Sequence, residues 1–129
     1  MDSEIKFSVI IPAYNPGKKI IPCLKSLGRN LNYLSKSYNL KYEVIIINDA
    51  GDQINLNFDH GIKNISSFRI RKNRGVGYAR QLGTRISKYN YIFYLDSDVV
   101  LESENSIKIL FEEFKNLKNT GSIGPVQNY

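Results

Sequence analysis

The stretch Tyr91-Ile-Phe-Tyr-Leu-Asp-Ser-Asp-Val-Val, residues 91–100, determines the predicted fold. Its first five residues, Tyr91–Leu95, carry no charge, and two carboxylates follow at Asp96 and Asp98. An apolar run of this kind is typical of a strand that a parallel sheet buries on both faces. Because residues i and i+2 of an extended chain point to the same side, we expect the two carboxylates to emerge together where the strand leaves the sheet.

The carboxylate pair has two interpretations. Two adjacent negative charges repel unless a positive charge lies between them, and oxygen ligands suit a hard divalent cation such as Mg²⁺ or Mn²⁺. Ligands of open α/β sheets bind at the carboxyl ends of the strands, so the pair indicates a metal-assisted site for a phosphate-bearing ligand. Asp-Ser-Asp is equally good chemistry for an acidic turn, and the stretch alone does not decide between the two.

The rest of the chain alternates between strand-like and helix-like patterns. Branched and apolar runs predict strands at residues 6–11, which Pro12 would stop, and at 42–47, 65–70 and 122–126. Asn15-Pro16 is a helix-start signal, and Ser103 can cap a later helix. This alternation predicts βαβ units and a mostly parallel, Rossmann-like α/β sheet flanked by helices in a single domain. The predicted helix faces are Ile20, Leu24, Leu27, Leu31 and Leu34; Ala79, Leu82, Gly83 and Ile86; and Ile107, Leu110, Phe111, Phe114 and Leu117.

Composition narrows the class of protein. A chain of 129 residues with 42% apolar and 23% charged residues is ordinary for one soluble domain. The lone Cys23 excludes an internal disulfide and suits a reducing compartment, and the chain shows neither a secretory signal nor a membrane-spanning run, so we expect a cytoplasmic location. The net charge of +6 favours an anionic partner, either a nucleotide or a membrane surface. The basic cluster at residues 69–74 lacks interleaved aromatic residues, so no nucleic-acid partner is expected.

Four strand exits carry polar or aromatic residues, and a parallel sheet would place all four at one edge. Tyr14 can stack on a flat base, Asp49 can accept a hydrogen bond from a base imide, and Arg80 can neutralise a diphosphate. Each also has an ordinary interpretation: turn packing, an Asx turn and an exposed helix arginine. The Gly75-Val-Gly77 segment lacks a third glycine and follows the third strand, which excludes a nicotinamide cofactor. The exits are Pro12-Ala-Tyr-Asn15, Asn48-Asp49, Asn73–Arg80 and Asp96-Ser-Asp98.

These motifs resemble, in order and spacing, those of glycosyltransferase family 2, which has the GT-A fold. Ser8-Val-Ile-Ile-Pro-Ala-Tyr-Asn is similar to the family's opening, and Glu43-Val-Ile-Ile-Ile-Asn-Asp-Ala-Gly-Asp to its second-strand acidic motif. Asn73-Arg-Gly-Val-Gly-Tyr-Ala-Arg-Gln-Leu-Gly is similar to its Asn-x-Gly…Ala-Arg-x-x-Gly segment. Leu95-Asp-Ser-Asp is similar to its DxD motif. The resemblance covers the chain from Ser8 to about Pro125.

The resemblance implies a sugar transfer from a nucleotide donor, usually a UDP-sugar, to a hydroxyl of a saccharide or lipid-linked acceptor, commonly with inversion. Tyr14 would stack on the base, Asp49 would bind it, Arg80 would lie near the base or the diphosphate, and Asp96 would face the ribose and the sugar. Asp98 would ligate Mn²⁺ or Mg²⁺. The donor-binding residues implied are Pro12, Ala13, Tyr14, Asn15, Asp49, Arg80, Asp96 and Ser97, and the implied metal ligands are Asp98 and Asp96.

The chain departs from the family pattern in two ways. Asn48 stands where an aspartate is usual, and Ala50-Gly51 replaces Gly-Ser, which leaves the nucleotide open. An inverting transferase also needs a base, and Glu102 and Glu104 lie too near the metal motif to serve. We therefore expect residues 1–129 to form the donor-binding half, with no identifiable catalytic base and with the acceptor-binding half absent. Membrane association, peripheral to the inner face, would come only through regions outside this chain, and surfaces left uncovered would favour self-association.

Two other functions fit parts of the sequence. A non-catalytic sugar-nucleotide-binding or assembly module would need the donor site and no base. A phosphatase of the haloacid dehalogenase type uses Asp-x-Asp after a strand, but there the pair follows the first strand and a lysine and an acidic pair come later. Here the pair follows the fourth strand with about thirty residues left, which disfavours the phosphatase.

Overall fold

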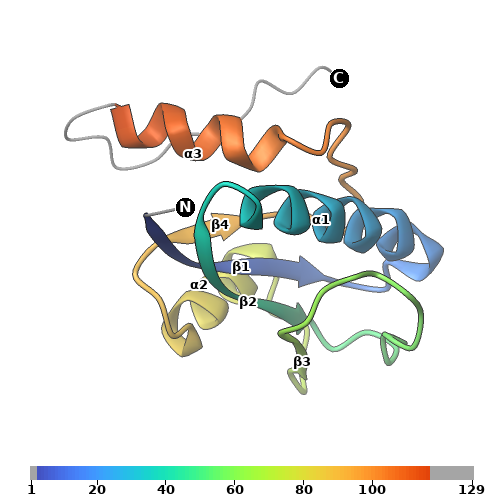
Figure 1. The fold of residues 1–129 in the computed structure, drawn as a ribbon. Coiled ribbons are helices and arrows are strands. Elements are labelled where there is room, and N and C mark those ends of the chain that lie inside the picture. Colours follow the sequence, from blue (N-terminus) through green and yellow to red (C-terminus); the bar gives the residue numbers. More distant parts are fainter. Residues whose placement is uncertain (1–2, 117–129) are drawn as a thin grey trace.

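The computed structural model describes residues 3–116, which form one four-stranded parallel sheet with helices on both faces (Figure 1). The sheet order is β3-β2-β1-β4, and every neighbouring pair is parallel. The predicted parallel α/β architecture is therefore confirmed. The strands are β1 (Glu4–Ala13), β2 (Asn39–Asn48), β3 (Ile65–Arg69) and β4 (Ile92–Tyr94), and the helices are the 3₁₀ turn η1 (Gly17–Lys19), α1 (Ile20–Ser35), α2 (Val76–Ile86) and α3 (Ser106–Asn116).

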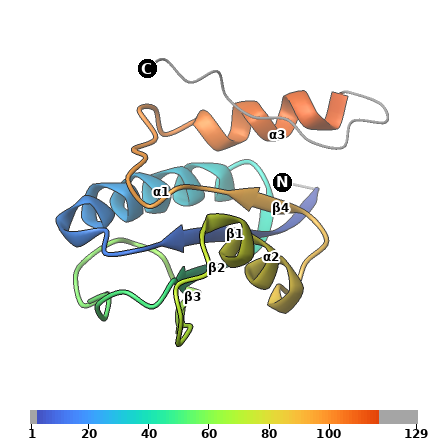
Figure 2. The same ribbon diagram turned by 180° about the vertical axis from the view of Figure 1, so that it is seen from behind.

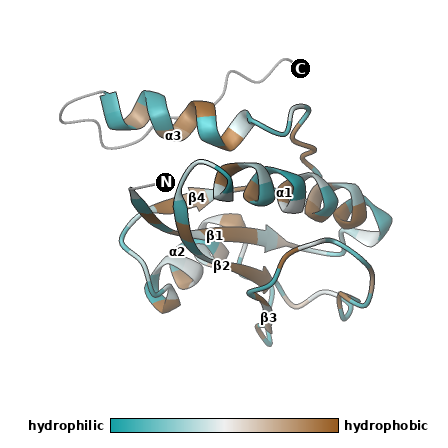
Figure 3. Ribbon diagram, in the orientation of Figure 1, coloured by the Kyte–Doolittle hydropathy of each residue, from teal (hydrophilic) through white to brown (hydrophobic). Residues whose placement is uncertain are grey.

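The helices form two layers around the sheet. Helix α1 covers one face and α3 lies alongside α1, while α2 covers the opposite face (Figures 1 and 2). Alternate residues of a strand point to opposite faces, so β1 and β2 divide their apolar side chains between the two layers. Val9 and Val44 pack on the α1 side, and Ile10 and Ile45 pack on the α2 side. Colouring by hydropathy shows the apolar strands between the helices (Figure 3).

Strand β1 continues through Pro12 to Ala13, so the prediction that Pro12 ends this strand is wrong. The backbone groups of Ser8 and Ile10 face β4: the Ser8 N–H donates to Tyr91, and the Ile10 carbonyl accepts from Leu95. Pro12 is the next residue with this orientation, and β4 pairs with β1 only over Ser8–Ile10. The missing N–H of Pro12 therefore removes no hydrogen bond from the sheet.

Neither predicted side-chain cap forms. Asn15 has a φ of 45° and lies outside the helical turn, whose cap is Pro16 and makes no side-chain hydrogen bond. Ser103 contributes its carbonyl oxygen, which accepts from the Ser106 N–H at 3.2 Å, and not its hydroxyl. The first turn of α3 is instead held by the Asn30 Oδ1, which accepts from the Ile107 N–H at 3.0 Å. A cap supplied from a distant helix leaves no local sequence signal.

Strand β4 is shorter and more exposed than the sequence predicts. It spans three residues at one edge of the sheet, and Tyr91 and Tyr94 beside and within it are exposed. Ile92 and Phe93 are half-buried and Tyr94 is exposed, so the predicted full burial of this strand on both faces is not observed. The predicted strand at 122–126 and the predicted helix residue Leu117 lie outside the described residues. Across the described helices, none is long and apolar enough to span a bilayer.

Gly28 sets a close approach between α1 and the irregular segment that follows β2. A Cβ built on Gly28 would lie 1.9 Å from the backbone oxygen of His60, which cannot rotate away. We predict that Gly28→Ala lowers the free energy of unfolding by about 3 kcal/mol, measured by urea denaturation. Gly77→Ala is the matched control, because nothing lies within 4 Å of its Cβ position, and it should be neutral or gain up to about 1 kcal/mol. Equal stability of the two variants would contradict this packing.

Candidate functional site

The carboxyl ends of all four strands lie at one edge of the sheet, because every pair is parallel. Direct contacts join the neighbouring exits. The Asp49 N–H donates to the Ala13 carbonyl at 2.8 Å, and the Ile70 N–H donates to the Asn48 carbonyl at 2.9 Å. The predicted gathering of polar strand exits at one edge is therefore present in the structure, and open α/β sheets bind their ligands at this edge.

Asp49 fastens the exit of β2 to the start of α2. Its side chain is only 4% exposed, and its two oxygens accept the backbone N–H groups of Arg74 and Gly75 at 2.8 Å each. These N–H groups stand at the N-terminus of α2, where unpaired donors and the helix dipole favour a negative charge. Asp49 thus has a structural role that explains its burial. Its contact with a base stays a prediction, for which lone pairs of the carboxylate remain.

Asn48 explains why an amide replaces the usual carboxylate at this position. Its Oδ1 accepts from the Gly51 N–H at 3.0 Å, and its Nδ2 donates to the Asp52 carbonyl at 2.8 Å. An ionised carboxylate can make the first bond but has no proton for the second. Asn48 is also fully buried. The departure from the family pattern therefore closes the turn after β2.

The first exit places an exposed aromatic ring above a buried strand end. Tyr14 is 56% exposed, whereas Pro12 and Ala13 are buried in β1. The Asn15 Oδ1 accepts from the Asp52 N–H at 2.7 Å, so Asn15 links this exit to the turn after β2. A Cβ on Gly51 would lie 2.6 Å from the Asn15 Oδ1, and the contact therefore requires glycine. The stacking role of Tyr14 stays a prediction that its exposure allows.

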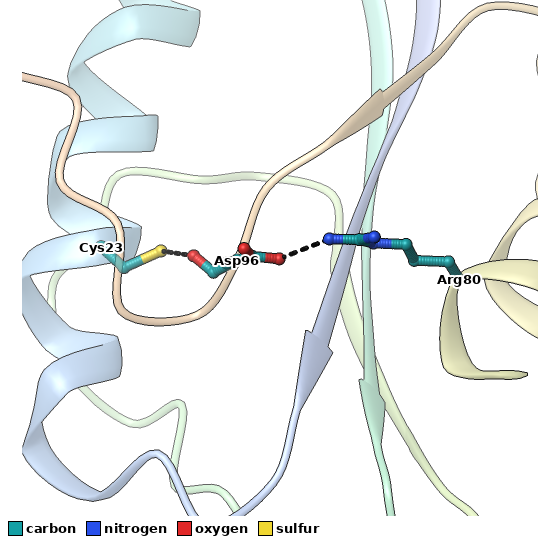
Figure 4. A network of polar contacts seen from close by, with 3 residues as sticks. All are labelled: Cys23, Arg80 and Asp96. Atoms are coloured by element: carbon teal, nitrogen blue, oxygen red, sulfur yellow. Dashed lines mark hydrogen bonds and ion pairs between the residues drawn. The ribbon is translucent and has the colours of Figure 1, made fainter. Parts of the chain in front are cut away.

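Asp96, Ser97 and Asp98 lie in a turn. Strand β4 ends at Tyr94, and the Val99 N–H donates to the Asp96 carbonyl at 3.1 Å. Asp96 and Asp98 therefore do not lie in extended chain, and the prediction that they point to the same side for that reason does not apply. Asp96 is half-buried and contacts two helices (Figure 4). The Arg80 Nη2 from α2 lies 3.0 Å from its Oδ1, and the Cys23 Sγ from α1 donates to its carbonyl oxygen at 3.6 Å.

The polar and charged groups around this turn differ in their exposure to solvent. The Arg80 and Asp96 side chains are 42% and 45% exposed, so their ion pair adds about 1 kcal/mol or less to stability. The Arg80 Nε is buried and has no hydrogen-bond partner among the described residues. Burial, followed by the Asp98 and Asp96 charges, raises the pKa of Cys23 to about 12. Both carboxylates therefore act on the same side of α1.

Asp96 and Asp98 offer two carboxylates to a metal ion, whose other coordination positions a bound ligand would fill. In the described part of the chain, no group of three or more His, Cys, Asp or Glu side chains is placed to hold a metal ion. Asp98 is exposed and Asp96 keeps its Oδ2 beyond the Arg80 contact. Mg²⁺ and Mn²⁺ take oxygen ligands, and Mg²⁺ is commonly bound through one or two carboxylates together with substrate phosphates. Two carboxylates would leave the remaining positions around such a metal to other oxygen ligands, such as water or phosphate.

Sequence reasoning missed three residues of α1 that contact the segment carrying this turn. From the sequence, Cys23 serves only to exclude an internal disulfide and to indicate a reducing compartment, and Ser26 and Asn30 are not singled out. Their signal is a polar residue at a position that the helical pattern places on the buried face. A second missed residue type is the arginine at the end of β3: the Arg69 Nε donates to the Gly51 carbonyl at 2.9 Å and holds the turn after β2.

A parallel α/β sheet with an acidic turn, a guanidinium and an exposed tyrosine at its carboxyl edge is typical of nucleotide-binding proteins. The model of the family described as Glycosyl transferase family 2 matches residues 8–129, and the chain belongs to this family. The family resemblance seen in the sequence motifs is thereby confirmed.

Named relatives agree with the family. The chain is 36% identical over 112 residues to the poly(ribitol-phosphate) beta-N-acetylglucosaminyltransferase TarP of Staphylococcus aureus, across 82% of this chain and 32% of the relative. It is 31% identical over 112 residues to a chondroitin synthase of Escherichia coli, across 84% of this chain and 15% of the relative. It is 26% identical over 132 residues to the glycosyltransferase GlyG of Streptococcus pneumoniae, across 95% of this chain and 39% of the relative. The chain thus spans well under half the length of these relatives.

Solved structures share the fold. TarS 1–349 of S. aureus superposes with a TM-score of 0.66 at 22% identity, over 95% of this chain and 39% of that chain. A structure of TarS 1–349 in complex with UDP-GlcNAc superposes with a TM-score of 0.63 at 22% identity, over 95% of this chain and 37% of that chain. These likenesses establish that the sheet and its helices follow the arrangement seen in TarS.

The buried thiol of Cys23 gives a test of the contact beneath Asp96. Because its pKa is raised to about 12, the thiolate fraction at pH 8 is far below that of an ordinary thiol. We predict that iodoacetamide modifies Cys23 of the folded chain about a thousandfold more slowly than in urea, followed by mass spectrometry. Modification at the same rate in both conditions would show that Cys23 does not lie buried under the turn.

The structural role of Asp49 can be separated from any role in binding. Asp49→Asn keeps the size of the side chain but turns one acceptor oxygen into a donor. Either the Arg74 N–H loses the Asp49 oxygen, or the Gly75 N–H is left with the Asn73 Oδ1 at 3.2 Å. We predict a loss of about 1–3 kcal/mol in the free energy of unfolding. Asp52→Asn is the control, because the Asp52 side chain is exposed. Thermal or urea unfolding measures both, and an unchanged Asp49→Asn variant would contradict the anchoring of α2.

Proposed function

We propose that this chain carries the donor-binding part of an inverting, metal-dependent glycosyltransferase that uses a UDP-sugar and transfers the sugar to a hydroxyl of a saccharide or lipid-linked acceptor. The observation that carries the proposal is the meeting of Arg80 and Asp96 at 3.0 Å, which brings a guanidinium from α2 to the acidic turn after β4. Family membership and a TarS structure with UDP-GlcNAc support a nucleotide-sugar donor.

The base and the diphosphate would be bound by different elements. Tyr14, at the end of β1, offers an exposed ring for stacking on uracil, and Pro12 and Ala13 form the buried support behind it. Asp49 would accept from the base imide while it holds the start of α2. Asn15 shapes this side of the site through its contact with the turn after β2. This side of the site involves neither Asp96 nor Asp98.

The phosphate side of the site combines one cationic group and two carboxylates. Arg80 would neutralise part of the diphosphate charge through its partly exposed guanidinium. Asp98 and Asp96 would hold Mn²⁺ or Mg²⁺, with Ser97 between them in the turn and Asp96 also facing the ribose and sugar. When bound, the metal supplies Lewis-acid stabilisation of the departing nucleoside diphosphate.

The acceptor side would be supplied by residues that lie beyond the donor-binding region. An inverting transfer needs a carboxylate that takes the proton of the acceptor hydroxyl. Glu102 and Glu104 lie in the segment that follows the metal turn and are exposed, and neither is proposed as the base. The chain spans 32% of TarP, and the acceptor-binding half would correspond to the part of such relatives that it does not match. We place the reaction in the cytoplasm, peripheral to the inner face of the membrane.

Calorimetric titration with UDP, with and without Mn²⁺, tests the donor site. We predict that Mn²⁺ raises the affinity for UDP at least about tenfold, and that Asp98→Ala removes this metal dependence, because one of two carboxylate ligands is lost. Glu104→Ala is the matched control: it removes an exposed carboxylate six positions further along and should leave the metal dependence intact.

The outcomes separate the candidate functions. Metal-dependent binding of UDP together with release of sugar from a UDP-sugar supports a transferase, whereas the same binding without transfer fits a donor half or a non-catalytic sugar-nucleotide module. Failure to bind any nucleotide would refute the donor site. An Asp98→Ala variant that keeps its Mn²⁺ dependence would refute the assignment of Asp98 as a ligand.

A further inference from the structure

Helix α1 carries a polar stripe, Cys23, Ser26 and Asn30, on its buried face. The three side chains are 0%, 0% and 1% exposed. Their spacing of three and four residues places them in one row along the helix, among the leucines that pack on the sheet. Burying polar groups costs free energy unless each finds a hydrogen-bond partner, so three in one row require an explanation.

Besides two bonds within α1, from the Ser26 Oγ to the Cys23 carbonyl and from the Asn30 Nδ2 to the Ser26 carbonyl, the polar stripe contacts the segment between β4 and α3 and the start of α3. The Cys23 Sγ donates to the Asp96 carbonyl at 3.6 Å, and the Leu101 N–H donates to the Ser26 Oγ at 3.0 Å. The Asn30 Nδ2 donates to the Ser103 carbonyl at 3.0 Å, while its Oδ1 accepts from the Ile107 N–H at 3.0 Å. Successive turns of α1 therefore hold successive points of one backbone segment.

The segment held in this way is the one that carries Asp96, Ser97 and Asp98. Residues 95–105 contain no helix or strand, so their backbone groups have no ladder of their own. A connecting segment of this kind normally lies on the surface with its polar backbone groups in water. Here Leu95, Val99 and Leu101 pack against the core on the α1 side, and the polar stripe supplies the hydrogen bonds that water would otherwise make.

The placement of the two carboxylates depends on this backbone. Asp98 is exposed, and within residues 3–116 the carboxylate of Asp96 is held by Arg80 alone. A metal site requires its ligands within a few tenths of an ångström, and rigid supporting contacts provide that precision. Figure 4 shows Asp96 between the two helices, with Cys23 of α1 at its backbone carbonyl and Arg80 of α2 at its carboxylate.

We propose that Cys23, Ser26 and Asn30 are positioning residues, which hold the 95–105 segment so that Asp96 and Asp98 can bind the metal and the diphosphate together. This inference rests on the proposed function for the identity of the ligand. None of the three touches the ligand itself. They act through the backbone at Asp96, Leu101 and Ser103, and their loss affects the phosphate side of the site while the base side, built on β1 and β2, stays intact.

The test compares two ligands on the full chain: UDP with Mn²⁺, which needs the acidic turn, and uridine without metal, which needs only the base side. We predict that Ser26→Ala and Cys23→Ala each lower the affinity for UDP with Mn²⁺ about five- to tenfold and leave the affinity for uridine unchanged, measured by NMR titration. Cys23→Ser restores a donor to the Asp96 carbonyl and should recover most of the affinity. Arg29→Ala, an exposed neighbour on the same helix, should change neither ligand.

A second measurement needs no ligand. Amide hydrogen exchange of residues 97–105 should become about tenfold faster in Ser26→Ala, while β1 and β2 keep their protection. Asn30→Ala removes three hydrogen bonds, two of them to residues outside α1. If it fails to fold, Ser26→Ala, which loses one bond to the 95–105 segment and one within α1, still decides the question.

Three results overturn the inference. If Ser26→Ala and Cys23→Ala bind UDP with Mn²⁺ as well as the unmodified chain does, the polar stripe does not position the turn. An equal loss for uridine and UDP shows a general loss of structure and refutes a positioning role. If the unmodified chain binds neither ligand, the proposed function fails first, and the inference falls with it.

Discussion

The parallel pairing of β1 with β2 on one side and β4 on the other is the constraint on which the rest of the structure depends. It runs over ten residue pairs with β2 and three with β4, and it sends every strand exit to the same edge of the sheet. Residues separated by more than eighty positions, such as Tyr14 and Asp98, thereby come to one edge. No side-chain contact could gather them without this shared strand direction, because each exit by itself is an ordinary turn.

Two carboxylates at this edge serve the fold and remain suited to a ligand. Asp49 is buried at the start of α2 with two backbone donors, whereas Asp96 is half-exposed between Cys23 and Arg80. Each carboxylate oxygen has more than one lone pair, so such contacts orient the group without exhausting it. Asn48 also serves the fold, because its amide both accepts and donates a hydrogen bond in the turn after β2, which a carboxylate could not do. A substitution at Asp49 is therefore expected to lower stability whether or not Asp49 also contacts a ligand.

Much of this arrangement follows from the sequence, because strands and turns leave local signals. The branched runs predict four strands, and their alternation with helical patterns predicts the parallel sheet. The polar residues that follow the strands predict that the site lies at the carboxyl edge of the sheet. The failures concern features whose partners are distant in the chain. Pro12 is tolerated because β4 is short, and Asn30 caps α3 from 77 positions away. The polar stripe could have been suspected from polar residues within an apolar helix face, but its partners could not, since nothing local to residues 95–105 identifies α1 as the neighbour.

The brevity of β4 has a consequence for how the site opens. Three paired residues contribute few ladder hydrogen bonds, so the acidic turn after β4 draws its order from side chains of α1 and not from the sheet. Local opening in proteins occurs in cooperative units of unequal stability. We expect the β1–β2 pair, which would carry the wall for the base in the proposed donor site, to be the more protected unit, and the acidic turn to belong to a weaker unit that opens without unfolding the sheet. In the proposed donor site, entry and release of the diphosphate would then need only this local opening, whose free energy depends on the buried polar face of α1.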